Sequence, residues 1–108
     1  MGIKAIRSCY PQGKIKAFTL SYDDGNVADR KLVGMFNKYG LKGTFHLNSG
    51  PILEGDSWRI SKEEVRDLYA GHEISIHSLT HPFLDRCQKD VMVTEVLEDR
   101  RNLERLAG

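Results

Sequence analysis

The chain has 108 residues, of which 40% are hydrophobic and 29% are charged, a composition that suits one small globular domain. At a formal net charge of +1, no basic stripe argues for a nucleic-acid partner and no acidic tail argues for a solvating segment, so charge decides little about partners. No apolar run approaches the roughly 20 residues that span a bilayer, and residues 1–14 lack the apolar core of a signal peptide.

The first two strands and the helix between them follow a lead-in over residues 1–14. Residues 15–22, "IKAFTLSY", are rich in β-branched and aromatic residues, which predicts a buried strand. Apolar residues then recur at helical spacing from 27 to 39, and Gly40 is a typical helix end. Residues 42–47, "KGTFHL", predict the second strand.

The second half of the chain repeats this alternation. Residues 48–58, "NSGPILEGDSW", have the composition of a loop. Ser61 and Glu64 have the spacing of a capping box, which predicts a short helix that ends at Gly71. Residues 73–77, "EISIH", predict the third strand, and Met92, Val96, Leu103 and Leu106 mark a final helix over roughly 90–106.

The predicted order βαβαβα requires a parallel sheet with helices packed against it. Three parallel strands leave two unpaired edges and a small core, whereas parallel sheets are normally covered on both faces. We therefore expect the chain to be part of a larger α/β unit, truncated before the later strands and able to self-associate through its sheet edges. The alternative is a small three-layer domain that is complete as it stands.

Two polar clusters lie at the ends of predicted strands. Asp23 and Asp24 close the first strand in "LSYDDG", and His77 and His81 follow the third in "HSLTHP". Alone, the acidic pair is typical of a turn, and two histidines four residues apart are common on surfaces. In a parallel sheet, however, the carboxyl ends of all strands lie on one edge, where such folds place their chemistry. The topology therefore predicts that the four side chains meet.

One carboxylate and two imidazoles would form a three-ligand site with an open position, the pattern of a catalytic metal. Neutral imidazole suits zinc, and cobalt or nickel also fit this ligand set. The second carboxylate can then act as a base toward the attacking water. Adjacent residues at a strand end can diverge, so that one faces the metal and the other faces the water.

These motifs resemble those of the polysaccharide deacetylases, the NodB-homology family of carbohydrate esterases (family 4). "SYDDG" is similar to the family motif T-F-D-D-G, and "HSLTHP" is similar to H-[ST]-x-x-H-[PS]. "KGTFHLNSG" and "AGHEISIHSLTHPFL" also resemble family segments, and the likeness covers roughly residues 15–107. The resemblance implies that Asp23 is the catalytic base and that Asp24, His77 and His81 bind the metal.

The resemblance implies a metal-dependent hydrolase that removes N- or O-acetyl groups from a sugar polymer and releases acetate. Chitin oligomers, peptidoglycan and xylan are all compatible substrates. The family fold is a distorted (β/α) barrel about twice as long as this chain, so residues 1–108 would form a partial domain, the βαβαβα portion. The family's later arginine, Asp/Trp and Leu-x-His motifs, the last carrying the general acid, have no counterpart after "HSLTHP".

Some residues depart from the family pattern. Ser21 and Tyr22 replace Thr-Phe, and His46 stands where the family has an aromatic or aliphatic residue. We interpret His46 as a packed strand residue and His72 as a helix-to-strand residue, not as ligands. Two other interpretations remain open: a non-catalytic metal- or carbohydrate-binding module with the same fold, and another metal hydrolase on a similar barrel, such as a phosphoesterase.

The two cysteines, Cys9 and Cys87, form no CxxC pair and are expected to be unrelated thiols. They therefore do not fix the redox compartment. The sequence is compatible with a cytoplasmic protein as written and, if a leader was removed, with an extracellular or cell-envelope protein.

Overall fold

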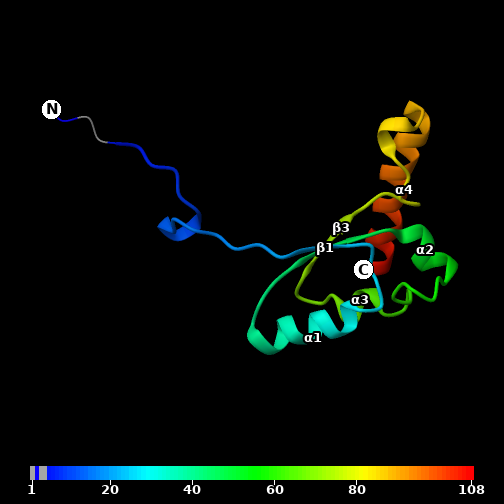
Figure 1. Ribbon diagram of the computed structural model, residues 1–108, viewed down its shortest axis with the longest axis horizontal. Coiled ribbons are helices and arrows are strands. Elements are labelled where there is room, and N and C mark those ends of the chain that lie inside the picture. The colour runs from blue at the N-terminus through cyan, green and yellow to red at the C-terminus, as the bar shows by residue number, and fades with distance from the viewer. Residues whose placement is uncertain (1, 3–4) are drawn as a thin grey trace.

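The computed structural model of the chain describes residue 2 and residues 5–108 (Figure 1). Residues 5–19 are exposed and extend away from the folded part as an arm, interrupted by a short 3-10 turn, η1, at Pro11–Gly13. The strand predicted over 15–22 is therefore wrong for 15–20. The Thr44 amide donates to the Leu20 carbonyl at 2.8 Å, and among the residues that the structure describes no strand pairs with residues 15–19.

Three short parallel strands form the sheet, which confirms the predicted α/β class (Figure 1). They are β1 (Ser21–Asp23), β2 (Thr44–Leu47) and β3 (Glu73–Ile76), in spatial order β1-β2-β3. Asp23 pairs with His46, and His46 pairs with Ser75. This register brings the carboxyl ends of all three strands to one edge of the sheet.

Four α-helices connect and follow the strands: α1 (Asp29–Tyr39), α2 (Ser49–Glu54), α3 (Val65–Leu68) and α4 (Lys89–Ala107). Helix α1 ends at Gly40, as predicted. Residues 48–58, predicted as a loop, contain helix α2. The sequence does not predict this helix, because its six residues show too little periodicity. Helix α3 is shorter than expected, and a 3-10 turn, η2 (Leu84–Arg86), precedes α4.

The core lies between β2 and the helices. Phe45 and Leu47 of β2 are completely buried, as expected for the central strand. Helix α1 buries Val33 and Phe36, whereas its apolar residues Met35 and Tyr39 are exposed. The buried hydrophobic residues of the core are Val33, Phe36, Phe45, Leu47, Ile52, Ile60, Val65, Tyr69 and Leu103.

Helix α4 differs most from its prediction. It contacts β3 and the helices α2 and α3, but Val96 is exposed, and of the four predicted stripe residues only Leu103 is fully buried. The buried face instead carries the polar residues Glu95, Asp99 and Asn102, which lie on one stripe at spacings of four and three residues.

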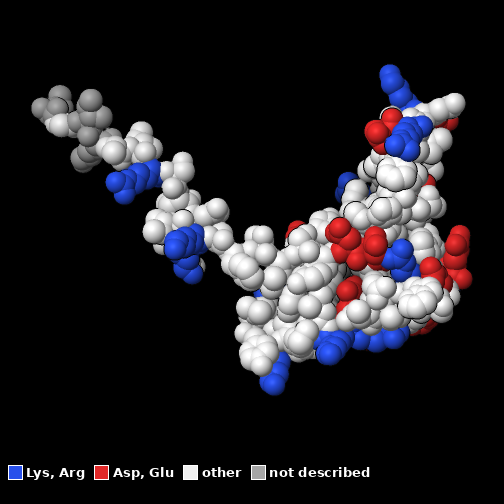
Figure 2. Space-filling model, viewed as in Figure 1, with Lys and Arg blue, Asp and Glu red and all other residues white. Residues whose placement is uncertain are grey.

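The surface of the folded part mixes acidic and basic side chains on the face seen in Figure 2, whereas the N-terminal arm shows only basic ones. No helix within the described residues is both long and apolar enough to cross a membrane. Both cysteines are free, Cys9 on the arm and Cys87 before α4, as expected for unrelated thiols.

An ion pair joins α1 to the segment before α3. Arg30 Nε lies 2.7 Å from Glu64 Oε1, and Nη2 lies 2.8 Å from Oε2. Glu64 also accepts a hydrogen bond from the Ser61 amide at 3.0 Å, as the capping box predicts. The hydrogen bonds from Arg30, followed by those from Ser61, lower the pKa of Glu64 from 4.5 to about 2.

The stabilising effect of Glu64 is therefore expected to depend on pH. A carboxylate whose pKa is lowered by folding stabilises the fold above its unfolded pKa and loses this effect as the pH falls through the folded value. Because both side chains are partly exposed, Glu64→Gln is expected to lower the free energy of unfolding by about 0.5–1 kcal/mol near neutral pH. The difference from the wild type should shrink between pH 4.5 and about 2.

Urea unfolding at several pH values measures this difference, and Glu63→Gln is the matched control because Glu63 is the more exposed neighbour. A Glu64→Gln difference that stays constant down to the acid end of the range would contradict the assignment.

Candidate metal centre

The acidic pair lies where β1 turns into the following loop. Asp23 is the last residue of β1, and the Asp24 amide continues the ladder by donating to the His46 carbonyl at 2.7 Å. Asp24 then adopts a left-handed backbone conformation (φ 77°), which an aspartate tolerates better than most residues. This change of backbone direction lets the two neighbouring carboxylates take different positions.

Gly25 continues the left-handed turn (φ 67°) against the core. A Cβ atom at this position would lie 3.0 Å from Cδ2 of Leu47 and 3.4 Å from Cδ1 of Ile52. The glycine of "DDG" is therefore required both by its backbone conformation and by the close packing beneath the acidic pair.

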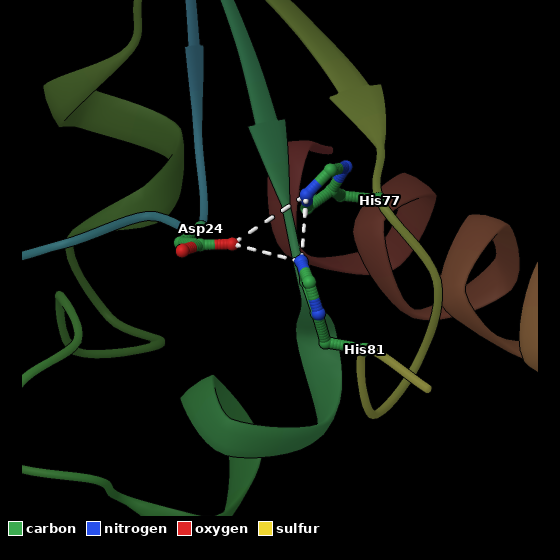
Figure 3. Close-up of side chains that lie close together, drawn as sticks. All are labelled: Asp24, His77 and His81. Atoms are coloured by element: carbon green, nitrogen blue, oxygen red, sulfur yellow. Dashed lines mark hydrogen bonds and ion pairs between the residues drawn. The ribbon is translucent and has the colours of Figure 1, made fainter. Parts of the chain in front are cut away.

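Asp24, His77 and His81 converge on one point (Figure 3). Asp24 Oδ1 lies 3.5 Å from His77 Nε2 and 3.6 Å from His81 Nε2, and the two Nε2 atoms are 3.1 Å apart. Metal–ligand distances of about 2.0–2.1 Å in a tetrahedral site place neighbouring ligand atoms about 3.3 Å apart. The three atoms thus form a triangle of the size that a zinc-like ion requires.

The Oδ1 atom of Asp24 gives independent support for a cation at this point. It is buried and has no hydrogen-bond partner, although the aspartate side chain as a whole is partly exposed. Buried carboxylate oxygens are normally paired, because an unpaired one loses its hydration without compensation. A divalent ion between Asp24 and the histidines would supply the missing partner, so the residues present fit a bound metal.

Asp23 lies beside this triangle and is not part of it. Its Oδ2 atom is 4.0 Å from His77 Nε2, and its side chain is 59% exposed. A carboxylate at this distance can reach a water molecule next to the three-ligand site while remaining accessible to solvent. The structure therefore brings together all four residues singled out in the sequence, with Asp23 at the rim.

The other two histidines are not part of the triangle. His46 Nε2 lies 2.7 Å from the Ser21 hydroxyl, and its ring centroid is 6.2 Å from that of His77. His72 lies at the opposite end of β3, where Nδ1 accepts a hydrogen bond from the Gly43 amide and Nε2 lies 2.9 Å from Asn37 Oδ1. Burial lowers the pKa of His72, as expected for a neutral structural imidazole.

Arg59 contacts the ligand set from a segment that sequence reasoning did not single out. Its Nη1 donates to the Asp24 carbonyl at 2.7 Å and lies 3.6 Å from Asp24 Oδ2. Arg59 therefore holds one carboxylate oxygen while the other faces the histidines. No spacing or motif in "DSWRIS" indicates this contact, which depends on the antiparallel bridge between Asn26 and Arg59.

Asp29, the first residue of α1, is bonded to the core residue Tyr69. Its Oδ2 accepts a hydrogen bond from the buried Tyr69 hydroxyl at 2.6 Å. Burial raises the pKa of Asp29; the hydrogen bond from Tyr69 opposes this shift, and the nearby Asp24 charge adds to it. Burial and the bond to Asp29 also raise the pKa of Tyr69.

An open hollow of about 490 Å³ adjoins the two histidines. Beyond the histidines, its walls are mostly apolar. The lining residues are Ile76, His77, Ser78, His81, Pro82, Phe83, Leu84, Asp85 and Val96. A small apolar group of a ligand held at the triangle would fit this wall.

Comparison with known proteins identifies deacetylases as the proteins that this chain resembles. Residues 11–108 match the family model described as polysaccharide deacetylase. A search of curated protein sequences found no significant match. Among solved structures, the chain is similar to the Streptococcus pyogenes deacetylase PplD in complex with acetate, with 21% identity and a TM-score of 0.78 over 82% of this chain and 40% of that chain.

Two further structures show the same likeness. The Bc1960 peptidoglycan N-acetylglucosamine deacetylase is 26% identical, with a TM-score of 0.72 over 83% of this chain and 41% of that one. A family 4 carbohydrate esterase from Bacillus anthracis is 20% identical, with a TM-score of 0.67 over 83% of this chain and 42% of that one. The chain thus spans about two fifths of the length of the structures that it matches.

Proposed function

Because this chain belongs to the polysaccharide deacetylase family (carbohydrate esterase family 4), we propose that it carries the metal-binding and base residues of a site that removes acetyl groups from a polysaccharide. The reaction is hydrolysis of an N- or O-acetyl group with release of acetate. The observation that carries the proposal is the triangle of Asp24, His77 and His81 with Asp23 beside it.

Asp24, His77 and His81 would hold the metal, and zinc suits this ligand set best. When bound, such an ion polarises the acyl oxygen and lowers the pKa of a water molecule to near 7. Arg59 supports this assignment, because its contacts with Asp24 fix the direction in which the carboxylate points. Cobalt or nickel could occupy the same ligands.

Asp23 would act as the general base. Its carboxylate lies at the rim, close enough to His77 to reach the attacking water and exposed enough to pass the proton to solvent. The base need not bind the metal, which agrees with its position outside the triangle.

The hollow beside the histidines would take the acetyl methyl group against the side chains of Pro82, Phe83 and Leu84. An N-acetylated glycan such as peptidoglycan is the substrate that the comparisons support best, since the 26%-identical structure is a peptidoglycan N-acetylglucosamine deacetylase. Chitin oligomers and acetylated xylan share the reacting group and belong in the same test.

Acetate release from peptidoglycan, chitin oligomers and acetylated xylan tests the proposal, with a phosphodiester as the contrasting substrate. We expect release that stops on chelation and returns when Zn²⁺ or Co²⁺ is added. The 108 residues alone should turn over slowly, because the family's general-acid motif is not among them. Phosphodiester cleavage in its place, or acetate release that resists chelation, would contradict the proposal.

A further inference from the structure

The loop that carries both histidines has an unfavourable backbone. Ser78 (φ 68°) and His81 (φ 61°) lie in the left-handed region, although neither is a glycine. Residues other than glycine keep this conformation only where the surrounding structure holds them in it. The contacts of the segment 77–81 therefore decide whether the two imidazoles stay in place.

Asp99 of helix α4 makes the central contacts. Its carboxylate is completely buried and forms no salt bridge within the part of the chain that the structure describes. One oxygen accepts a hydrogen bond from the Ser49 amide at 2.7 Å, and the other accepts one from the His77 amide at 2.9 Å. A buried charge is costly unless its hydrogen bonds are satisfied, and here both oxygens bind backbone amides beside the site.

Glu95 lies one turn earlier on the same stripe and holds the far half of the loop. Its carboxylate accepts hydrogen bonds from the Thr80 amide at 2.8 Å and from the Thr80 hydroxyl at 2.7 Å. The Leu79 amide donates to the Glu95 carbonyl at 3.0 Å. The residue just before His81 is thus tied directly to helix α4.

The segment after β2 closes the loop from the other side. Asn48 donates from Nδ2 to the carbonyls of His77 and Ser78. The Gly50 amide donates to the Leu79 carbonyl at 2.9 Å, and a Cβ atom at Gly50 would lie only 2.4 Å from that oxygen. Every residue from His77 to Thr80 is therefore bonded to α4 or to the segment after β2.

We infer that Asp99 is a positioning residue, assisted by Glu95, that holds the loop in the conformation in which His77 and His81 meet Asp24. The role rests on the proposed metal centre. Within the described residues, Asp99 forms no hydrogen bond with a ligand side chain, and its link to the site is the His77 amide. A polar stripe on the inner face of an otherwise amphipathic helix is explained if it orients the ligands, because core packing alone would favour apolar residues there.

Cobalt binding tests this role without any substrate. The chain is titrated with Co²⁺ alone, and both affinity and visible absorption are recorded. In Asp99→Asn the amide group can accept only one of the two backbone N–H groups and turns its own N–H₂ toward the other. We expect a 10- to 100-fold loss of affinity, as for other residues that orient metal ligands, together with a changed absorption spectrum.

Asn102→Ala is the matched control. Asn102 lies on the same buried stripe, but its amide donates to the Ser49 side chain and makes no bond to the histidine loop. The Asn102→Ala substitution should lower the stability of the fold and leave the Co²⁺ spectrum and the Co²⁺ affinity of the folded protein unchanged. If Asp99→Asn does not fold, Glu95→Gln, which loses one of two bonds to Thr80, is judged by the same criteria.

The results of the Co²⁺ titrations can overturn the positioning role of Asp99 in several ways. Asp99→Asn also removes a charge, so weaker binding with an unchanged spectrum would reflect electrostatics and overturn the positioning role. Unchanged affinity and spectrum would overturn it as well, as would equal changes in Asn102→Ala. Failure of the wild-type chain to bind Co²⁺ would overturn the proposed metal centre itself, and this role with it.

Discussion

His77→Ala is expected to weaken Zn²⁺ or Co²⁺ binding by roughly 100- to 1,000-fold, because binding free energies of about 10–16 kcal/mol in zinc sites are shared among three or four ligands. Of the three proposed ligands, His77 can be substituted with the least disturbance of the backbone. The backbone of His77 keeps its bonds to Asp99 and Asn48, whereas substitution of Asp24 or His81 also changes a left-handed residue. Isothermal titration of the metal measures the loss.

His46→Ala is the control for this experiment. Its imidazole lies near that of His77 but bonds to Ser21 and does not belong to the triangle. We expect its metal affinity to stay close to that of the wild type. An equal loss in both variants, or no loss in His77→Ala, would contradict the ligand assignment.

The second large effect is expected from Asp23→Asn, which should lower kcat for deacetylation by roughly 10²- to 10⁴-fold, the range for removal of a general base. Metal affinity should change little, because the Asp23 carboxylate lies outside the triangle and is well exposed. The two readouts are acetate release under saturating metal and direct metal titration on the same preparation.

Asp67→Asn, a substitution of an exposed carboxylate on α3, controls for loss of one negative charge. If Asp23→Asn retained its rate, Asp23 would not be the base. If neither the wild type nor the variant released acetate while both bound the metal, a domain that only binds metal or carbohydrate would become the better interpretation. If it lost its metal instead, Asp23 would be a ligand and the division of roles between the two carboxylates would be wrong.

The meeting of the four site residues could be predicted because it depends on topology alone. Asp23, Asp24, His77 and His81 follow strands of one parallel sheet, and such strands end on a common edge. The exact direction of each side chain does not affect that argument. Their roles as base and ligands stay predictions.

Other features depended on partners that lie far away in the chain. Residues 15–19 have strand-like composition, but a strand also needs a neighbour, and the bonds to β2 begin only at Leu20. Glu95 and Asp99 look like solvent-facing residues of an amphipathic helix. Their burial follows from the amides of Ser49, His77 and Thr80, whose position no local pattern reveals.

The left-handed turn at Asp24 makes two chemically identical neighbours inequivalent. Because the backbone reverses its hand between them, neither carboxylate can substitute for the other after a mutation, even though only one peptide bond separates them. The pair therefore provides no redundancy. Inserting or deleting a single residue in this strand would move one carboxylate into the place of the other and leave its own place without one.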